Sequence, residues 1–286
     1  MTAATAHTGA PIRAKRVLPG FTLSLGVTLL YLTFIVLIPV LALILKGAEI
    51  GPARFWQIIS SPRAVAAFQI TLTAAVIATI FNAIYGLLMA WVLVRYEFRG
   101  KRILDALMDV PFALPTAVAG LSLTALFSAN GWFGGVLEAA GLQIVYTIWG
   151  IALAMAFTSV PFVVRTVQPV LEDMDPALEQ AAITLGARPW AIFTRVVFPA
   201  ILPAWLAGCT TAFARSLGEF GAIVFIAGNL PFRTEIAALL AFIRLEEFDY
   251  NGAAAIALVL LGFALVLLVL SNLLQVWASR HREATR

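Results

Sequence analysis

Charged side chains are scarce in this sequence of 286 residues: they make up 12% of it, whereas hydrophobic residues make up 62%. A soluble domain usually carries about 25% charged residues. Six long stretches have no charge at all, and this pattern excludes an ordinary soluble domain. These stretches are residues 17–45, 64–94, 110–137, 139–164, 196–214 and 250–279.

Cysteine and histidine are almost missing, which removes several kinds of chemistry. Cys209 is the single cysteine, so an intrachain disulfide and a zinc site of paired thiols are excluded. The two histidines, His7 and His281, lie in the tails, so the long apolar stretches contain no histidine base. A phosphate-binding Gly-x4-Gly-Lys-Ser/Thr loop is missing too, which argues against ATP hydrolysis by this chain. We predict no metal, no cofactor and no enzymatic activity.

Five of the charge-free stretches exceed the roughly 20 residues that a helix needs to cross the hydrocarbon core. The sixth, 196–214, continues to Ile226 with Arg215 and Glu219 inside it. Strands of a β-barrel would alternate over about 10 residues, and this chain lacks such a pattern. Because backbone groups in lipid must pair internally, the stretches should be helices. The predicted fold class is an all-α integral membrane protein with six transmembrane helices.

The predicted boundaries follow from the same stretches. The third span carries Pro111 and Pro115, so we expect a kinked helix there. The chain is expected to divide into a tail over 1–16, one transmembrane domain over 17–279 and a tail over 280–286. The six spans are expected at about 18–45, 66–94, 105–128, 144–166, 200–226 and 253–278.

Arginine and lysine gather on one side of the predicted spans. Thirteen of the 19 basic residues fall in the two tails, the 2–3 loop and the 4–5 loop, and five fall on the other side. Cytoplasmic segments carry the excess of positive charge. Both termini and the 4–5 loop are therefore expected in the cytoplasm, and the net charge of +4 requires no nucleic acid as a partner.

The inner loop between the fourth and fifth spans, residues 167–199, predicts structure of its own. Asp175 is a good N-cap and Pro176 suits the first helical position. Gly186 is a natural helix stop. These three residues predict a short helix over 176–185.

A second short helix is expected from about 189 to 197, after which Pro199 opens the fifth span. The first helix has an apolar face at helical spacing, formed by Leu178, Ala181, Ala182 and Leu185. An isolated helix of this length is marginal in water. Its apolar face should therefore dock either on the cytoplasmic ends of the protein's own spans or on a partner.

The fifth span is expected to hold charges inside the membrane, where each is costly and marks a functional-site hypothesis. Arg215 and Glu219 are four residues apart, so they can pair along one helix face. One interpretation is a self-neutralised pair that fixes helix packing, aided by Gly218 and Gly221. The other is a translocation path for an anion, formed with Ser216, in which the forked donors of arginine suit a tetrahedral oxyanion.

The outer loop between the fifth and sixth spans also predicts a short helix, within residues 233–247. Its apolar residues Ile236, Leu239, Leu240 and Ile243 follow helical spacing. This helix is expected either to pack on its own bundle or to form a docking surface for a partner protein.

Part of the inner loop resembles the EAA loop of ABC importer permeases, whose pattern is E-A-A-x3-G-x9-I-x-L-P. Here it reads Gln180-Ala181-Ala182-x3-Gly186-x9-Val196-x-Phe198-Pro199. Gln180 replaces the glutamate, with Glu179 just before it. The resemblance implies a type I ABC importer fold in which the loop forms a coupling helix that inserts into a cleft on the ATPase. The implied coupling residues are Glu179, Gln180, Ala181, Ala182, Leu185, Gly186 and Pro199.

Residues 214–222 resemble the molybdate and sulfate permeases, which both serve tetrahedral oxyanions. Four further segments are similar to the sulfate/thiosulfate permeases of the T-subunit type: 109–120, 154–171, 226–229 and 247–250. The likeness implies a permease for sulfate or thiosulfate in the bacterial inner membrane. It also implies a second permease of the W type, two ATPase subunits and a periplasmic sulfate- or thiosulfate-binding protein.

Three other functions are weighed against this one. A permease for another oxyanion such as molybdate would share the same motifs. An intramembrane enzyme would need a base beside Cys209 or Ser216, and the spans contain no histidine. A secondary transporter predicts more intramembrane carboxylates and broken-helix repeats, whereas Glu219 is the one deep carboxylate expected here.

Overall fold

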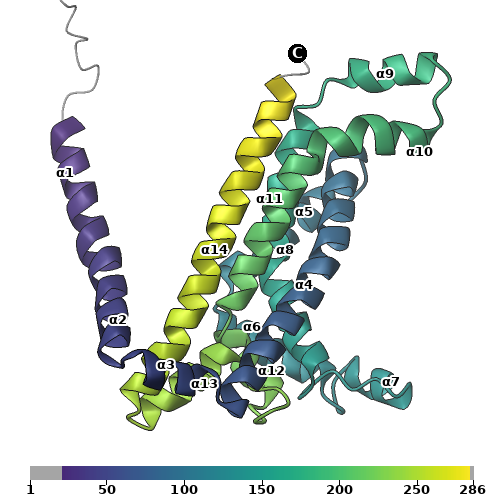
Figure 1. Ribbon diagram of the computed structural model, residues 1–286. Coiled ribbons are helices and arrows are strands. Elements are labelled where there is room, and N and C mark those ends of the chain that lie inside the picture. Colours follow the sequence, from purple (N-terminus) through teal and green to yellow (C-terminus); the bar gives the residue numbers. More distant parts are fainter. Residues whose placement is uncertain (1–20, 284–286) are drawn as a thin grey trace, which may run out of the picture. The chain divides into compact units, whose positions relative to one another are not determined.

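The computed structural model describes residues 21–283, and each regular element within that range is a helix (Figure 1). A sixth crossing beside five long apolar helices comes from a bent pair, Lys101–Ala113 and Thr116–Phe127. The predicted all-α protein with six spans is therefore confirmed. The five long helices are Phe21–Glu49, Pro62–Arg95, Ile148–Glu172, Pro189–Leu217 and Tyr250–Leu270.

The segment up to Glu49 is a unit of its own, and the rest of the chain from Ile50 forms a second unit. In the first unit, α1 (Phe21–Leu32) and α2 (Ile38–Glu49) are joined by the π-helical segment η1 (Thr33–Leu37). The backbone N–H of Ile38 donates to the carbonyl of Thr33. This wider turn lies just before Pro39, which has no N–H of its own, and the helix passes the proline without ending.

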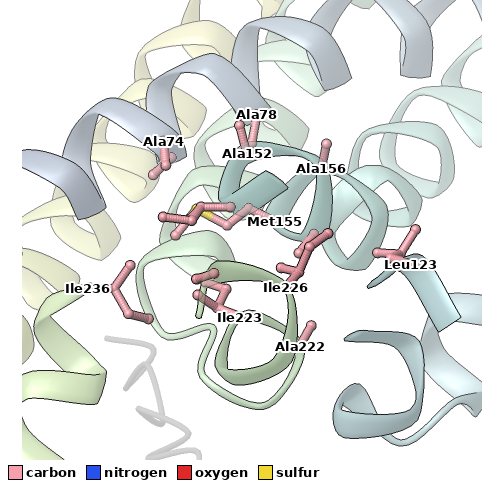
Figure 2. Packing of buried hydrophobic residues seen from close by; sticks show 14 of the residues in the cluster. Ala74, Ala78, Leu123, Ala152, Met155, Ala156, Ala222, Ile223, Ile226 and Ile236 are labelled. Carbon is pink, nitrogen blue, oxygen red and sulfur yellow. The ribbon is translucent and has the colours of Figure 1, made fainter. Parts of the chain in front are cut away.

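The second unit is centred on α4 (Pro62–Arg95), α8 (Ile148–Glu172) and α11 (Phe198–Leu217). Small residues let α4 and α8 approach closely, as is usual where membrane helices pack. A Cβ on Gly86 of α4 would lie 2.8 Å from the side chain of Val163 on α8. Figure 2 shows the same principle in another part of the core, where alanines of α4 and α8 lie on one side of Met155.

The third span differs from the single kinked helix that was predicted. It consists of α5 (Lys101–Ala113) and α6 (Thr116–Phe127), which are bent by 115°. Leu114 has an extended backbone with ψ near 132°, because the ring of the following Pro115 disfavours the helical conformation there. Pro111 is accommodated inside α5, so one of the two prolines breaks the span and the other does not.

The fifth span was predicted wrongly at both ends. Its helix begins at Pro189 and passes through α10 (Pro189–Ile192) and the π-helical segment η2 (Phe193–Val197) into α11. The expected second short helix is therefore continuous with the span, since the π turn before Pro199 lets the helix pass that proline, as in η1. The helix ends at Leu217, with Gly218 as its C-cap, and α12 (Gly221–Ala227) is separate.

The C-terminus of α14 (Tyr250–Glu283) lies at one end of the bundle, and several short helices lie at the opposite end (Figure 1). They include α3 (Pro52–Ile59), α7 (Gly134–Ala139) and α13 (Ala237–Glu246). The helix predicted within 233–247 is thus confirmed as α13. Its buried face packs on the chain's own bundle, where Leu240 belongs to a cluster with Ala64 of α4 and Ile256 of α14.

An ion pair fixes the segment before α13 to the first turn of α4. Arg63 donates to both carboxylate oxygens of the fully buried Glu235, at 2.8 and 2.7 Å. Thr71 adds a second link, because its hydroxyl accepts a hydrogen bond from the backbone N–H of Ala237 at 2.8 Å. These contacts hold this end of the bundle in one arrangement.

Replacing Gly120 with alanine should destabilise the bundle. The added Cβ would lie 2.3 Å from the carbonyl oxygen of Ala222, so the backbones of α6 and α12 would have to separate. Overpacking of this kind costs about 1–3 kcal/mol, which thermal unfolding of the detergent-purified protein would detect. Gly262→Ala in α14 is the matched control, since no atom lies within 4 Å of the added Cβ. Equal unfolding temperatures for both variants would contradict this close packing.

Candidate functional site

The predicted inner-loop helix is confirmed as α9 (Pro176–Thr184). The carboxylate of Asp175 accepts a hydrogen bond from the backbone N–H of Ala177 at 2.9 Å, as expected of an N-cap. Gly186 has φ of +80°, a left-handed conformation that favours glycine, and it terminates the helix. Local signals alone therefore explain where this helix begins and ends.

α9 extends away from the bundle formed by α4, α8 and α11, at the end where α14 terminates (Figure 1). Its apolar face is largely uncovered: the side chain of Leu178 is 54% exposed and that of Leu185 is 88% exposed. Ala182 is half-buried and packs against the core with Met174. Of the two expected docking modes, contact with the protein's own spans thus accounts for Ala182 but leaves Leu178, Ala181 and Leu185 open.

An ion pair ties α9 to the last residue of α4. Arg95 donates to the carboxylate of Glu179, and its guanidinium carbon lies 5.4 Å from the ring centroid of Trp91. Glu179 is therefore engaged within the chain, whereas the neighbouring Gln180 is exposed. Pro199 lies ten residues after the start of its helix at Pro189, about 15 Å along the axis, and is not part of the exposed surface of α9.

The second predicted site lies where α11 ends. Arg215 pairs with Glu219 at 2.8 Å, as predicted from their spacing. Glu219 does not lie on the helix, however, but in the short segment between α11 and α12. Its side chain is only 1% exposed, and its Oε1 accepts a hydrogen bond from the backbone N–H of Ala222 at 3.3 Å. A buried carboxylate thus faces a guanidinium that is 36% exposed.

Ser216 joins a buried polar network that the sequence analysis did not identify. Its hydroxyl lies 3.2 Å from the hydroxyl of Ser159 on α8. The amide of Asn82 on α4 donates to that Ser159 hydroxyl at 2.8 Å and to the carbonyl of Ala156 at 3.1 Å. The network crosses α4, α8 and α11 beside the Arg215–Glu219 pair. Asn82, an amide in the middle of a charge-free span, is the signal in the sequence that could have indicated this network.

A further ion cluster between α5 and α8 was also missed. Arg165 donates to Asp109 at 2.7 and 2.8 Å and to Asp105 at 2.6 Å. The two aspartates stand four residues apart, on one face of a helix, and that spacing could have indicated a shared cation. The cluster fixes the α5 half of the broken span to the central bundle.

Comparison with known proteins places this architecture in a family. Residues 82–283 match the family described as binding-protein-dependent transport system inner membrane component. The chain belongs to this family. It is therefore a multi-pass permease component of the membrane.

Curated relatives of this permease have narrower names. The sulfate transport system permease protein CysT of Escherichia coli strain K12 is 55% identical over 264 residues, which are 92% of this chain and 95% of that protein. The protein of the same name from Synechococcus elongatus is 49% identical and covers 89% of this chain and 91% of its own length. The permease thus matches these relatives over nearly their whole length.

Solved structures share the fold of this permease at low sequence identity. A chain of a bacterial alginate ABC transporter, in complex with a periplasmic protein bound to an alginate pentasaccharide, gives a TM-score of 0.73 at 19% identity. The match covers 88% of the permease and 92% of that chain. An amino acid ABC transporter gives a TM-score of 0.53, also at 19% identity. These likenesses confirm the expected fold of an ABC importer permease.

Proposed function

We propose that this chain is the T-type permease subunit of an ATP-driven importer for sulfate or thiosulfate. The observation that carries the proposal is the 55% identity to a sulfate transport system permease over 92% of this chain. The buried Arg215–Glu219 pair and the exposed α9 provide the two parts that such a subunit needs: a polar place in the bundle and a surface for an energy-supplying partner.

The proposed assembly contains a second permease of the W type, two ATPase subunits and a periplasmic sulfate- or thiosulfate-binding protein. In the proposed orientation both termini and α9 lie in the cytoplasm of the bacterial cell, which the excess of basic residues in those segments supports. Then α13 and the Arg63–Glu235 pair face the periplasm, from which the binding protein delivers the anion. The proposed division is a tail over 1–16, a transmembrane domain over 17–279 and a tail over 280–286.

We propose that α9 is the coupling helix, with the loop 167–199 as its support. Leu178, Ala181 and Leu185 are accessible to a partner surface, and burial of their apolar area is the expected driving force for docking. Glu179 acts indirectly, since it holds α9 against Arg95 of α4. Because α9 leads within a few residues into the helix Pro189–Leu217, movement of α9 is transmitted to Arg215 through one continuous element.

The proposed translocation path passes Arg215, Ser216 and the segment that carries Glu219. An anion that moves past this point meets a guanidinium whose charge is already balanced by a buried carboxylate. Such a site attracts the anion without binding it so tightly that release becomes slow. Closure of the ATPase pair around ATP would then move α9 and change access to this point from one side of the membrane to the other.

Growth of a host that lacks its own sulfate uptake is the test of substrate. When the chain is expressed with its transporter partners, we expect growth on limiting sulfate or thiosulfate, and uptake of labelled sulfate that depends on ATP. Molybdate uptake without sulfate uptake would favour the alternative hypothesis, a permease for molybdate. Uptake by the chain alone, without an ATPase, would contradict the ABC importer and indicate a secondary transporter.

A further inference from the structure

An apolar groove of about 470 Å³ lies between α4 and the helix that carries α10 and α11. Its volume falls within the roughly 300–1,000 Å³ of typical ligand sites. Aromatic and aliphatic side chains form both walls, and three of the chain's seven tryptophans are among them. The principal lining residues are Ile84, Leu88 and Trp91 on one side and Trp190, Phe193 and Trp205 on the other.

The lining has almost no free hydrogen-bonding group for a polar ligand. The indole N–H of Trp205 is already engaged, since it donates to the carbonyl of Ala83 at 2.8 Å. A polar group placed in the groove would leave its hydrogen bonds to water without replacement, which is costly. The chemistry of the walls therefore selects a hydrocarbon chain.

One end of the groove is flanked by cations, and one of them is not neutralised. Arg95, beside Trp91, is paired with Glu179. Arg188 directly precedes the lining residue Pro189, is exposed, and forms no ion pair among the side chains that the structure describes. An apolar groove with a free positive charge at one end is complementary to an amphiphile with an anionic head.

The depth of the groove decides where its occupant comes from. Ile84 and Leu88 are 60% and 57% exposed, and they precede the end of α4 at Arg95 by eleven and seven residues. At 1.5 Å per residue these positions lie about 16 and 10 Å along the helix from its end. Both positions also lie within the charge-free stretch 64–94, which is expected to cross the hydrocarbon core. A soluble ATPase does not enter that region, so we expect the occupant to be a component of the membrane.

We propose that this groove holds an acyl chain of an anionic phospholipid, with the phosphate beside Arg188. In the proposed orientation, on which this step rests, the tryptophans and basic residues at this end of the groove lie at the inner membrane surface, where they suit this position of the headgroup. Because the acyl chain would lie between α4 and the helix that follows α9, a bound lipid would fix the spacing of these two helices. The proposal concerns lipid binding and does not depend on which anion is transported.

Native mass spectrometry of the full-length protein, purified in detergent and titrated with lipid, tests the proposal. We expect one phosphatidylglycerol to bind saturably, about fivefold more tightly than phosphatidylcholine, the ratio that one basic residue near an anionic headgroup provides. Arg188→Glu should remove this preference. Leu88→Trp should fill the groove and weaken binding of both lipids.

Two matched variants control for charge and bulk. Arg195→Glu changes an exposed arginine that neither lines the groove nor adjoins a lining residue, and Leu265→Trp enlarges an exposed residue on α14. Both should bind lipid like the unmodified protein. Absence of saturable binding, or equal effects of test and control variants, would overturn the proposal. So would a cross-link from a Leu88→Cys variant (in a Cys209→Ser background) to a second permease, since the groove would then be a subunit interface.

Discussion

Replacing Gly186 with arginine should abolish uptake while the protein remains in the membrane. Gly186 has φ of +80°, a conformation in which an L-amino acid is strained by about 1–2 kcal/mol. The new side chain would also place a charge beside the exposed apolar face of α9, next to Leu185. A loss of only 1.4 kcal/mol in docking is tenfold in affinity, so we expect ATPase binding to weaken by at least about tenfold.

The measurement is uptake of labelled sulfate in membrane vesicles, together with the amount of ATPase that co-purifies with the permease. Gly141→Arg is the matched control, because Gly141 follows α7 with the same φ of +80° and also has no atom within 4 Å of an added Cβ. This control carries the same backbone strain at the opposite end of the molecule and should leave the ATPase bound. Normal uptake by the Gly186 variant would refute α9 as the coupling helix.

Removing Arg215 should impair both stability and transport, and a second variant separates the two effects. In Arg215→Ala the carboxylate of Glu219, 1% exposed, loses its partner. Breaking a buried pair costs about 3–5 kcal/mol, and the lower end applies here because Arg215 is partly exposed. Replacing both members with apolar residues of similar size is often neutral or stabilising. The double variant Arg215→Met/Glu219→Leu should therefore regain most of the lost stability.

The double variant should regain stability without regaining transport. If the guanidinium guides the anion, the double variant unfolds like the unmodified protein yet takes up sulfate at a small fraction of its rate. Thermal unfolding in detergent and vesicle uptake, measured on the same preparations, separate these outcomes. Full uptake by the double variant would show that the pair serves packing alone and would remove Arg215 from the translocation path.

The helical spans and α9 were predictable because their signals are local. A charge-free stretch of sufficient length must form a helix in lipid, wherever its neighbours lie. Asp175, Pro176 and Gly186 define α9 through contacts within a few residues of each terminus. The ion pair of Arg215 and Glu219 was predicted from a spacing of four, although the two residues meet across a helix end rather than along a helix.

The predictions that were wrong concern prolines and helix ends. Pro115 breaks a span, whereas Pro111 and Pro199 do not. The outcome depends on whether the surrounding structure can accommodate the lost hydrogen bond, and a π turn does so before Pro199. α11 ends at Leu217, and the separate α12 that follows packs closely on α6, where a Cβ on Gly221 would lie 2.2 Å from the hydroxyl of Thr116.

By itself, the sequence determined that this protein spans a membrane six times, where α9 begins and ends, and which residues carry charge inside the spans. The tertiary structure alone decided that Ser159 contacts both Asn82 and Ser216, that Glu179 pairs with Arg95, and that Glu235 is buried against Arg63. Hydrophobic length and helix caps act over a few residues, so one sequence reveals them. Contacts between residues 57 to 172 positions apart exist only once the helices have packed.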